Sequence, residues 1–269
     1  MEVVRINSLT KRFSDNFSID NVNLSIPEGG IFGIVGTNGA GKTTMLKCIT
    51  GIIPFDSGSI YVFEKSVTDM GSSINRGIGV VYENSDNLFS YLSGQEQLEF
   101  AGEIYGLERK TMLKKINNLL EYFNMSEFRH NLIDEYSKGM KKKIAIASVL
   151  LQNPDLIILD EPFEGLDSIT LFKLKKLIGL LKTRGKTIII ISHFLAYIEE
   201  LCEEVIIMNK GKIIYQSKTD DISNRIKNEM SKETYLSLEE IFIDLTEDEN
   251  EQRNLENILW CLESKPQPI

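Results

Sequence analysis

A glycine-rich stretch that ends in lysine and threonine carries the clearest chemistry in the chain. It follows the apolar run 31–35 and reads Gly36-Thr37-Asn38-Gly39-Ala40-Gly41-Lys42-Thr43-Thr44. Glycine lets a backbone wrap around an anion, and the N–H groups at the start of a following helix point at that anion. Lys42 can then reach the β- and γ-phosphates, and Thr43 can ligate the accompanying Mg²⁺. The complete phosphate-loop pattern predicts nucleoside triphosphate binding and disfavours a chance glycine-rich turn. The residues expected to surround the phosphates are Gly36, Asn38, Gly39, Gly41, Lys42, Thr43 and Thr44.

Two adjacent carboxylates follow the apolar run 156–159 and form a second chemical group. At the end of a buried strand, Asp160 is placed to hold Mg²⁺ beside the phosphate loop, usually through water. Glu161 can orient or deprotonate the water that attacks the γ-phosphate. The alternative is an acidic strand end that faces solvent, which is less common for an Asp-Glu pair after an apolar strand. The pair therefore predicts hydrolysis as well as binding.

The elements that must position these groups begin with strands. Short strands are expected at 3–6 and 22–26, followed by the strand that feeds the phosphate loop, and further strands are expected at 60–63 and 77–82. Glu83 lies at the exit of the last of these strands. The first part of the chain is therefore rich in β-structure.

Helical patterns run from about residue 88 to 135. They begin with a capping box, in which the Ser93 hydroxyl and the Glu96 carboxylate satisfy early backbone donors. Apolar residues then recur at helical spacing on two faces. The first face is Leu98, Ala101, Gly102 and Tyr105, and the second is Leu113, Ile116, Leu119, Leu120 and Phe123. This stretch is predicted to be a helical insertion.

After this insertion the chain alternates between strand and helix. Apolar strands are expected at 156–159, 187–191 and 205–208, with a helix around 171–182. Such alternation predicts a parallel sheet that is covered by helices on both faces. The fold class is therefore α/β.

Composition limits the partners and the compartment. The 269 residues include 30 basic and 39 acidic side chains, a net charge of −9, which disfavours nucleic acid as a partner. Three scattered cysteines and two histidines suggest neither a disulfide framework nor a zinc site, so a reducing cytosol fits. The N-terminal residues do not resemble a signal peptide, and no apolar run approaches the ~20 residues of a membrane-spanning helix. We therefore expect any membrane role to depend on a partner.

The order of these motifs resembles that of the nucleotide-binding cassette of ABC transporters. The resemblance covers residues 1–216, most of the chain. Its motifs are the phosphate loop, the helical insertion, Ser137-x-Gly139, Asp160-Glu161-Pro162, Gly165-Leu166-Asp167 and Ser192-His193. It implies a P-loop NTPase core of the RecA-like type with an N-terminal antiparallel β subdomain, an α-helical subdomain inserted at about 88–135 and a short helical C-terminal appendage.

Position by position, the resemblance implies roles around the nucleotide of the same chain. Phe13 looks like the aromatic residue that stacks on adenine, although a Phe packed at a sheet edge is the alternative. Glu83 stands where the family usually has a glutamine that senses Mg²⁺ and the attacking water and faces the membrane partner. His193 resembles the switch histidine that contacts the γ-phosphate, whereas His130 has no such context and is expected to be merely exposed.

Other positions are implied to act on the nucleotide of a second cassette. Ser137 and Gly139, at a helix N-terminus, resemble the signature residues that offer a hydroxyl and a backbone N–H to that γ-phosphate. Asp167 resembles the aspartate that crosses the dimer interface. The sequence departs from the family's usual residues in two places. The signature has Tyr136 and Met140 in place of leucine and glutamine, and Glu83 adds negative charge near Mg²⁺.

Glu83 also indicates a subgroup. Such a glutamate resembles that of exporter cassettes for antimicrobial peptides, including lantibiotic immunity systems, and of related efflux systems. The segment 238–242 is similar to the C-terminal region of the same group. This segment belongs to a predicted helical appendage at 217–269, in which Leu255, Ile258, Leu259 and Leu262 form an apolar stripe. We expect that stripe to pack on the body or on a second copy, and the end with Pro266 and Pro268 to be a mobile tail.

These observations predict an ATP-binding and ATP-hydrolysing subunit that uses Mg²⁺. Two cassettes, either identical copies or paralogues, are expected to close head-to-tail on ATP and drive a separate membrane permease from the cytoplasmic face. The predicted cargo is an exported peptide, drug or similar compound.

Two other functions were weighed. A soluble cassette protein that acts on ribosomes or DNA would favour two cassettes in one chain or a long coiled-coil insertion, and the sequence has neither. A regulatory cassette that does not hydrolyse is disfavoured because Lys42, Asp160, Glu161 and His193 are all intact.

Overall fold

The computed structural model describes residues 1–14, 17–69, 77–84, 88–219 and 238–246. The chain divides into two compact units, Met1–Asp221 and Ile222–Ile269. The boundary expected after residue 216 stays a prediction. In the second unit the described element is α8 (Leu238–Thr246), which contains the segment 238–242. The apolar stripe and the terminal prolines lie outside the described residues.

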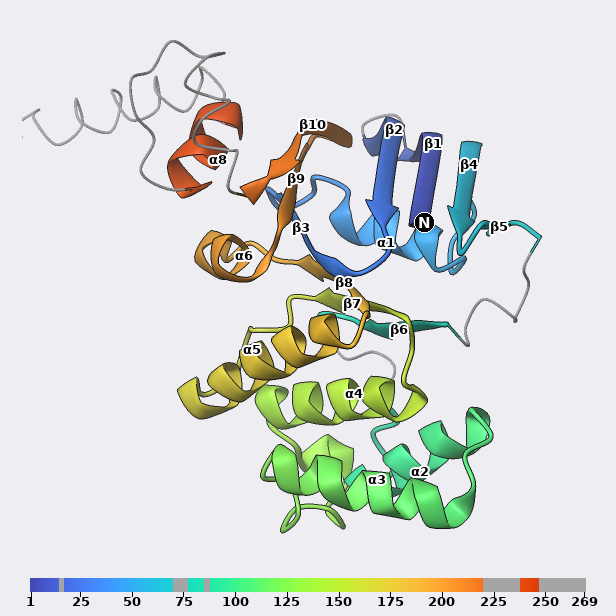
Figure 1. Ribbon diagram of the computed structural model, residues 1–269, viewed down its shortest axis with the longest axis vertical. Helices are drawn as coiled ribbons and strands as arrows, with labels where there is room; N and C mark the ends of the chain where they lie inside the picture. The colour runs from blue at the N-terminus through green and yellow to red at the C-terminus, as the bar shows by residue number, and fades with distance from the viewer. Residues whose placement is uncertain (15–16, 70–76, 85–87, 220–237, 247–269) are drawn as a thin grey trace, which may run out of the picture. The chain divides into compact units, whose positions relative to one another are not determined.

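The first unit is built on a six-stranded sheet with the order β10-β9-β3-β8-β7-β6 (Figure 1). Its strands are β3 (Gly30–Gly36), β6 (Ile78–Val81), β7 (Leu156–Asp160), β8 (Thr187–Ile191), β9 (Glu204–Asn209) and β10 (Lys212–Lys218). All neighbours pair in parallel except β10, which is antiparallel to β9. Since parallel strands end at one edge, the chain segments after β3, β7 and β8 meet there, and such an edge is where ligands bind.

Helices cover both faces of this sheet (Figure 1). They are α1 (Lys42–Ile49), α4 (Lys138–Gln152), α5 (Ser168–Thr183) and α6 (Leu195–Leu201). Alternate residues Phe32 and Ile34 of β3 join the apolar cluster that includes α1. Gly33 between them faces the opposite side, where an added Cβ would lie 2.5 Å from Ile198 of α6. Because both faces are covered, β3, β7 and β8 are buried along their whole lengths.

A four-stranded antiparallel sheet with the order β2-β1-β4-β5 forms the N-terminal β subdomain. It contains β1 (Glu2–Ser14), β2 (Phe17–Pro27), β4 (Ser57–Val62) and β5 (Lys65–Ser66). The first two strands are longer than the sequence predicts, because irregularities in their pairing break the simple alternation of apolar residues. At one irregularity Ser8 adopts a φ of 47°, and the apolar residues on its two sides, Ile6 and Leu9, are both buried.

The insertion contains α2 (Gly94–Ile104), α3 (Arg109–Tyr122) and the short 3₁₀ helix η2 (Ile133–Glu135). The capping box is present, since Ser93 Oγ accepts from Glu96 N and Glu96 Oε2 accepts from Ser93 N. Three residues of the predicted face, Leu98, Ala101 and Gly102, are buried in α2, and the fourth, Tyr105, is half-buried just past its end. In α3 the buried residues are Met112, Ile116 and Leu120, whereas Leu113 and Leu119 are partly exposed.

Met112 of α3 packs against Gly102 of α2. An added Cβ on Gly102 would lie 2.4 Å from the sulfur of Met112, so glycine leaves the space that this side chain fills. Methionine is unbranched and adapts to such gaps. The second apolar face therefore includes Met112 in addition to the predicted residues, of which Leu113 and Leu119 are half-buried.

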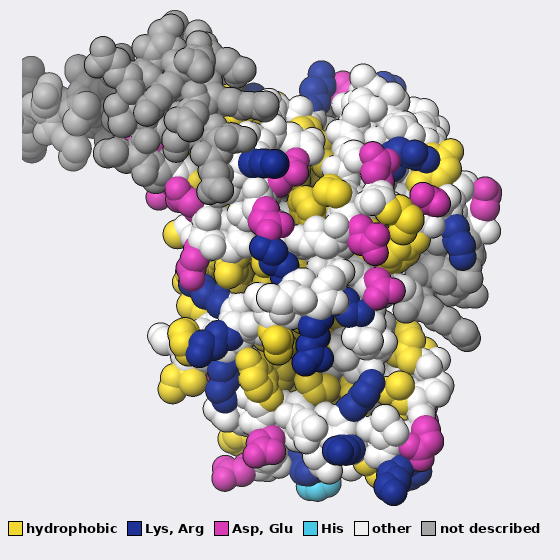
Figure 2. All heavy atoms as spheres, in the orientation of Figure 1, with side chains coloured by type: hydrophobic (Ala, Val, Ile, Leu, Met, Phe, Trp, Pro, Cys, Tyr) yellow, Lys and Arg dark blue, Asp and Glu magenta, His cyan; other side chains and the backbone are white. Residues whose placement is uncertain are grey.

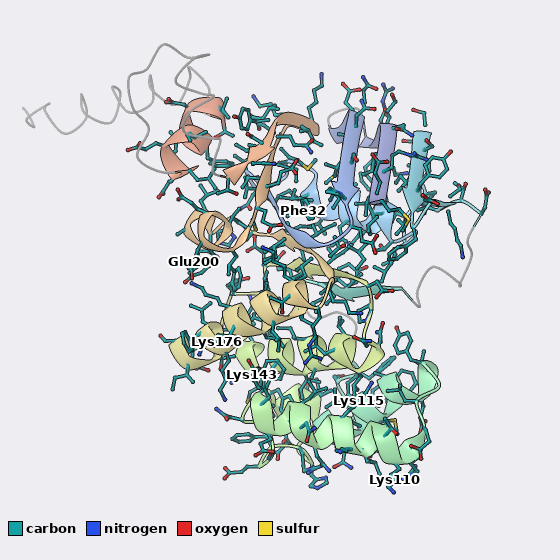
Figure 3. The ribbon with its side chains drawn as sticks, viewed as in Figure 1. Phe32, Lys110, Lys115, Lys143, Lys176 and Glu200 are labelled. Carbon is teal, nitrogen blue, oxygen red and sulfur yellow. The ribbon has the colours of Figure 1, made fainter. Side chains whose placement is uncertain are left out.

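Lysine and arginine side chains gather over α3, α4 and α5 on one face of the molecule (Figure 2). Lys143 projects from α4 and Glu200 from α6 (Figure 3). Lys143 pairs with Asp167, and Lys175 of α5 pairs with Glu200. Some of these basic side chains therefore form ion pairs between neighbouring helices of the same chain.

Candidate functional site

The phosphate loop connects β3 to α1 in the predicted strand–turn–helix arrangement. Gly39 and Gly41 have φ values of 80° and 103°, which are unfavourable for residues with side chains. Gly36 is close to β9, where an added Cβ would lie 2.5 Å from the carbonyl oxygen of Met208. Asn38 and Gly39 are exposed at the tip of the loop, and Thr44 is half-buried in α1. The loop is therefore shaped by glycine at three positions and is open to a ligand.

Lys42 lies across this loop. Its Nζ donates to the carbonyl oxygens of Gly36 at 2.8 Å and Thr37 at 3.1 Å. Burial lowers the pKa of Lys42, while the charges of Glu161, Asp160 and Glu83 act in the opposite direction. The ammonium group therefore lies between the phosphate loop and the acidic residues at the same edge of the sheet.

Thr43 and Asp160 come together from distant parts of the sequence. Thr43 Oγ1 donates to Asp160 Oδ2 at 3.3 Å. Asp160 is 2% exposed, and burial raises its pKa to about 6, with Glu161 and Glu83 adding to the increase. Burial makes the charged form of a carboxylate costly, and a nearby cation stabilises that charged form.

This donor set fits Mg²⁺. A hydroxyl and one carboxylate are oxygen ligands, and Mg²⁺ in nucleotide sites takes one or two carboxylates and obtains its other ligands from phosphates and water. Glu83 lies just after β6 and is exposed, and its charge contributes to the raised pKa of Asp160. Thr43 and Asp160 are therefore suited to hold the ion, and Glu83 to act on it through its charge.

Glu161 is fixed by the segment after β8. Ser192 Oγ donates to Glu161 Oε2 at 3.0 Å, and the backbone N–H of His193 donates to Oε1 at 3.0 Å. His193 Nδ1 also lies 2.8 Å from Oε1. Glu161 is 6% exposed, whereas the His193 side chain is 51% exposed. Glu161 is thus held in place, and the second imidazole nitrogen of His193 remains available to a ligand.

Ser192 and Lys142 are two residues of the site whose roles the sequence did not indicate. Ser192 is fully buried and also accepts from Phe194 N at 3.1 Å. Lys142 of α4 is fully buried, and its Nζ donates to the carbonyl oxygen of Glu83 at 2.7 Å. A signal for Lys142 exists, because it precedes the buried Ile146 and Val149 by four and seven residues, the spacing of one helix face.

The start of α4 carries the predicted signature residues. Ser137 caps the helix, with its Oγ accepting from Met140 N at 3.2 Å. Gly139 touches the loop before α5, since an added Cβ would lie 2.5 Å from Gly165 O. Asp167 caps α5 by accepting from Thr170 N at 2.8 Å. Among the described residues, no hydrogen bond or ion pair connects these groups to the phosphate loop of the same chain.

Phe13 lies near the end of β1 and is 57% exposed. The Nζ of Lys11 is 5.4 Å from the centroid of its ring. Most of the ring is therefore accessible for stacking, and its role remains a prediction. His130 is exposed, as expected.

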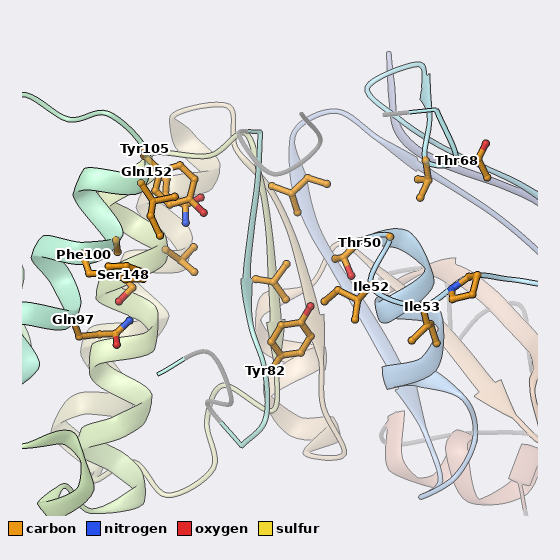
Figure 4. Close-up of a pocket in the computed structure, with 18 of the residues that line it drawn as sticks. Thr50, Ile52, Ile53, Thr68, Tyr82, Gln97, Phe100, Tyr105, Ser148 and Gln152 are labelled. Atoms are coloured by element: carbon orange, nitrogen blue, oxygen red, sulfur yellow. The ribbon is translucent and has the colours of Figure 1, made fainter. Parts of the chain in front are cut away.

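A groove of about 730 Å³ lies beside the end of β6 (Figure 4). The segment after α1 contributes Ile52 and Ile53, β6 and its exit contribute Val80 and Tyr82, and α2 contributes Phe100. Tyr82, which lines the groove, immediately precedes Glu83 in the chain. Within the described part of the chain, no helix is long and apolar enough to cross a membrane.

The phosphate loop at the edge of a parallel sheet, with Thr43 and Asp160 in contact and Glu161 beside them, defines a P-loop nucleoside triphosphatase. The family described as ABC transporter matches residues 19–164, more than half of the chain. The chain belongs to this family, and it is an ABC-type ATPase. The sequence-based fold class is confirmed.

Similar proteins of known sequence are consistent with this family. An uncharacterised ABC transporter ATP-binding protein, YhaQ of Bacillus subtilis (strain 168), is 36% identical over 82% of this chain and 72% of its own. The bacitracin transport ATP-binding protein BcrA of Bacillus licheniformis is 34% identical over 83% of this chain and 72% of its own.

Two structures show the same fold. An ATP-binding subunit of an ABC transporter superposes with a TM-score of 0.82 at 27% identity and covers 91% of this chain and 100% of its own. The dimeric ATP-binding cassette MJ0796, in a post-hydrolysis state bound to ADP and Pi, has a TM-score of 0.74 at 25% identity over 80% of this chain and 98% of its own.

Proposed function

We propose that this chain is the ATP-hydrolysing motor of an exporter whose pore is formed by a separate permease. The observation that carries the proposal is Glu161, held by Ser192 and His193 next to the contact between Thr43 and Asp160. This arrangement places a fixed carboxylate beside a site for phosphate and metal. A carboxylate in that place can orient the attacking water.

In this proposal each residue has a separate task. The N–H groups of the phosphate loop and Lys42 bind the phosphates, and Glu161 orients the attacking water. His193 faces the γ-phosphate with its free ring nitrogen. Thr43 and Asp160 would hold Mg²⁺, which when bound neutralises phosphate charge and fixes phosphate orientation. Positioning and electrostatic stabilisation supply most of the rate, since phosphoryl transfer needs little covalent chemistry from the protein.

The site is completed by a second cassette, either a copy or a paralogue. Ser137 is exposed at the start of α4 and Asp167 lies at the start of α5, where both are accessible to another chain. The N-terminus of α4 offers N–H groups and a positive dipole end to an anion. The dimeric state of the neighbour, which is bound to ADP and Pi, supports a dimer that forms with nucleotide. The head-to-tail arrangement with two nucleotides at the interface is part of our proposal.

The permease contacts the groove beside β6, on the inner face of the cell membrane. This groove has apolar and aromatic lining residues and lies next to Glu83, so a segment bound there touches the chain that leads to the metal site. The export of a peptide or drug is supported by two relatives, a bacitracin transport protein and a probable multidrug transporter protein.

Hydrolysis is tested with the purified chain. Phosphate release from MgATP is expected for the natural protein and is expected to fall at least ~100-fold in Glu161→Gln, with ATP binding retained. Glu121→Gln, an exposed change on α3, serves as the control and is expected to match the natural protein. Unchanged turnover in Glu161→Gln would remove Glu161 from its proposed role.

The transport function needs a different experiment. The chain is purified from detergent extracts of the cells that carry its gene, and the co-purifying membrane protein is identified. Cells with this pair are expected to tolerate more bacitracin than cells that carry the Glu161→Gln variant. Purification without any membrane protein, together with binding to ribosomes, would favour the soluble alternative.

A further inference from the structure

Lys142 is completely buried where three segments of the site meet. Its Nζ donates to the carbonyl oxygen of Glu83 at 2.7 Å. The same nitrogen lies 3.4 Å from the carbonyl oxygens of Tyr82 and Asp160. Tyr82 and Glu83 follow β6, and Asp160 ends β7. One side chain of α4 therefore connects the ends of two neighbouring strands.

The charge of this side chain is unusual for its position. A buried ammonium group is costly unless its three donors find acceptors, and here the acceptors are three backbone carbonyls. An apolar side chain of similar length would fill the space without this cost. The acceptors belong to the two acidic residues proposed to act on Mg²⁺, Glu83 and Asp160, and to Tyr82 of the adjoining groove.

A second buried lysine shows what a purely structural role looks like. Lys186 is 9% exposed and precedes β8. Its Nζ donates to Asn153 O at 3.1 Å and pairs with Asp155 at 2.8 Å. These residues lie before the start of β7, at the end of the strand opposite Asp160. Lys186 therefore provides a matched control with a buried ammonium group away from the site.

We propose that Lys142 is a positioning residue that links the N-terminal end of α4 to the metal-binding end of the sheet. Ser137 is the N-cap of the same helix and Gly139 lies in its first turn, less than two turns from Lys142. A rotation or shift of this helix end moves the Lys142 ammonium group, which is bonded to the carbonyl of Glu83. Contact of α4 with the nucleotide of the second cassette thereby adjusts the metal site of its own chain.

This inference rests on the proposed function, because it requires Ser137 and Gly139 to meet a nucleotide and Asp160 to hold Mg²⁺. It predicts a specific pattern of kinetics. Loss of the link is expected to lower the cooperativity of hydrolysis with respect to ATP and to increase the Mg²⁺ concentration that is needed. The affinity of a single chain for ATP is expected to remain, since Lys142 does not touch the phosphate loop.

The test compares Lys142→Met with Lys186→Met, each measured at least ~10 °C below the lower melting temperature. In Lys142→Met we expect kcat to fall about tenfold, the half-saturating Mg²⁺ concentration to rise about fivefold and KM for ATP to change less than about twofold. The Hill coefficient for ATP is expected to fall toward one. Lys186→Met is expected to melt at a lower temperature but to keep kcat and Mg²⁺ dependence within about twofold of the natural protein.

Two results would overturn the proposal. One is a folded Lys142→Met protein with unchanged kcat and Mg²⁺ dependence, and the other is an equal kinetic change in Lys186→Met. If the natural protein itself shows no Mg²⁺-dependent hydrolysis, the proposed function fails instead.

A measurement on the natural protein applies even if Lys142→Met does not fold. The side-chain ammonium signals of ¹⁵N-labelled lysine are recorded with ADP in EDTA and with MgADP. The Nζ signal of Lys142 is expected to shift when Mg²⁺ is present, while that of Lys186 stays in place. Equal shifts of the two signals, or no shift of Lys142, would contradict the link.

Discussion

At the scale of single residues, Glu161 is held in an unfavourable backbone conformation. Its φ is 46°, a region that costs a residue with a side chain about 1–3 kcal/mol. Its N–H donates to Ile191 O at 2.8 Å, and Ser192 and His193 hold its carboxylate. These contacts offset the cost and direct the carboxylate toward the edge where the phosphate loop lies.

The charge of Glu83 gives a prediction about Mg²⁺. Glu83→Gln removes a negative charge that acts on Asp160 and Lys42. We expect the half-saturating Mg²⁺ concentration for hydrolysis to rise about fivefold, corresponding to about 1 kcal/mol of lost attraction. ATP affinity is expected to change less than Mg²⁺ dependence or transport coupling. The measurement is a Mg²⁺ titration of ATPase activity, and a variant with affinity, Mg²⁺ dependence and coupling all unaltered would show that the charge has no role.

Asp160 gives a prediction about stability and pH. Its pKa of about 6 in the folded chain is above the ordinary value of 3.8, so folding favours the protonated form. The associated stability is present below about pH 4 and is lost as the pH rises through 6. Asp160→Asn is therefore expected to stabilise the metal-free protein by about 2 kcal/mol at pH 8 and by much less at pH 4.5, while abolishing hydrolysis.

Chemical unfolding in EDTA at these two pH values measures the difference between the natural protein and the variant. Titrating groups that do not interact with Asp160 contribute equally to both proteins and cancel, whereas Lys42 and Lys142 lose the effect of its charge in the variant. A variant that is no more stable than the natural protein at pH 8 would contradict the assignment.

The sequence predicted residues whose chemistry is visible in their type and spacing. Glu161 and His193 were predicted because a carboxylate and an imidazole follow buried strands. Ser192 and Lys142 were assigned no role, because a serine and a lysine acquire one only through the atoms that surround them. Lys142 occupies a buried helix face, but the sequence does not say which carbonyls it meets.

At the scale of elements, the start of α4 lies very close to the backbone of the loop before α5. Gly139 faces the carbonyl oxygen of Gly165, with no room for a Cβ. Lys138 pairs with Glu164 at 2.6 Å, and Lys143 pairs with Asp167 at 3.3 Å. The loop before α5 and the proposed signature helix are therefore connected by one close backbone approach and two ion pairs.

Two glycines in helices give a matched prediction. Gly139→Ala is expected to destabilise the fold by about 1–3 kcal/mol, because α4 or the neighbouring loop must shift. Gly179→Ala in α5 meets nothing within 4 Å and is expected to stabilise the fold by about 1 kcal/mol. Urea unfolding measures both changes. If Gly139→Ala and Gly179→Ala changed the stability equally, a Cβ at position 139 would not clash with the neighbouring loop.

The sequence analysis did not predict strand β10. β10 pairs with β9 through a two-residue turn at Lys210 and Gly211, which have φ values of 47° and 81°. Hairpin turns of this kind are usually recognised by Asn-Gly or Asp-Gly. Lys-Gly is a weaker signal, and β10 mixes apolar and polar residues at the edge of the sheet. The central strands were predictable because they are apolar throughout.

At the scale of the whole molecule, the proposed function assigns to one chain half of each of two sites. In this proposal the phosphate loop, Thr43 and Asp160 form one half, and the start of α4 with Ser137 forms the other. Among the described residues no hydrogen bond or ion pair joins these halves within the chain. Two chains placed head-to-tail bring a loop and a helix start together twice, which accounts for a dimer with two nucleotides.

The proposed dimer is tested most directly by the mass of the Glu161→Gln protein in solution, measured by sedimentation with and without MgATP. We expect a single chain without nucleotide and a dimer with MgATP, because the variant hydrolyses ATP slowly and retains it at the interface. Lys42→Ala, which weakens phosphate binding, is expected to remain a single chain. A Glu161→Gln protein that binds ATP fully but keeps the mass of one chain at all concentrations would show that ATP does not join two chains.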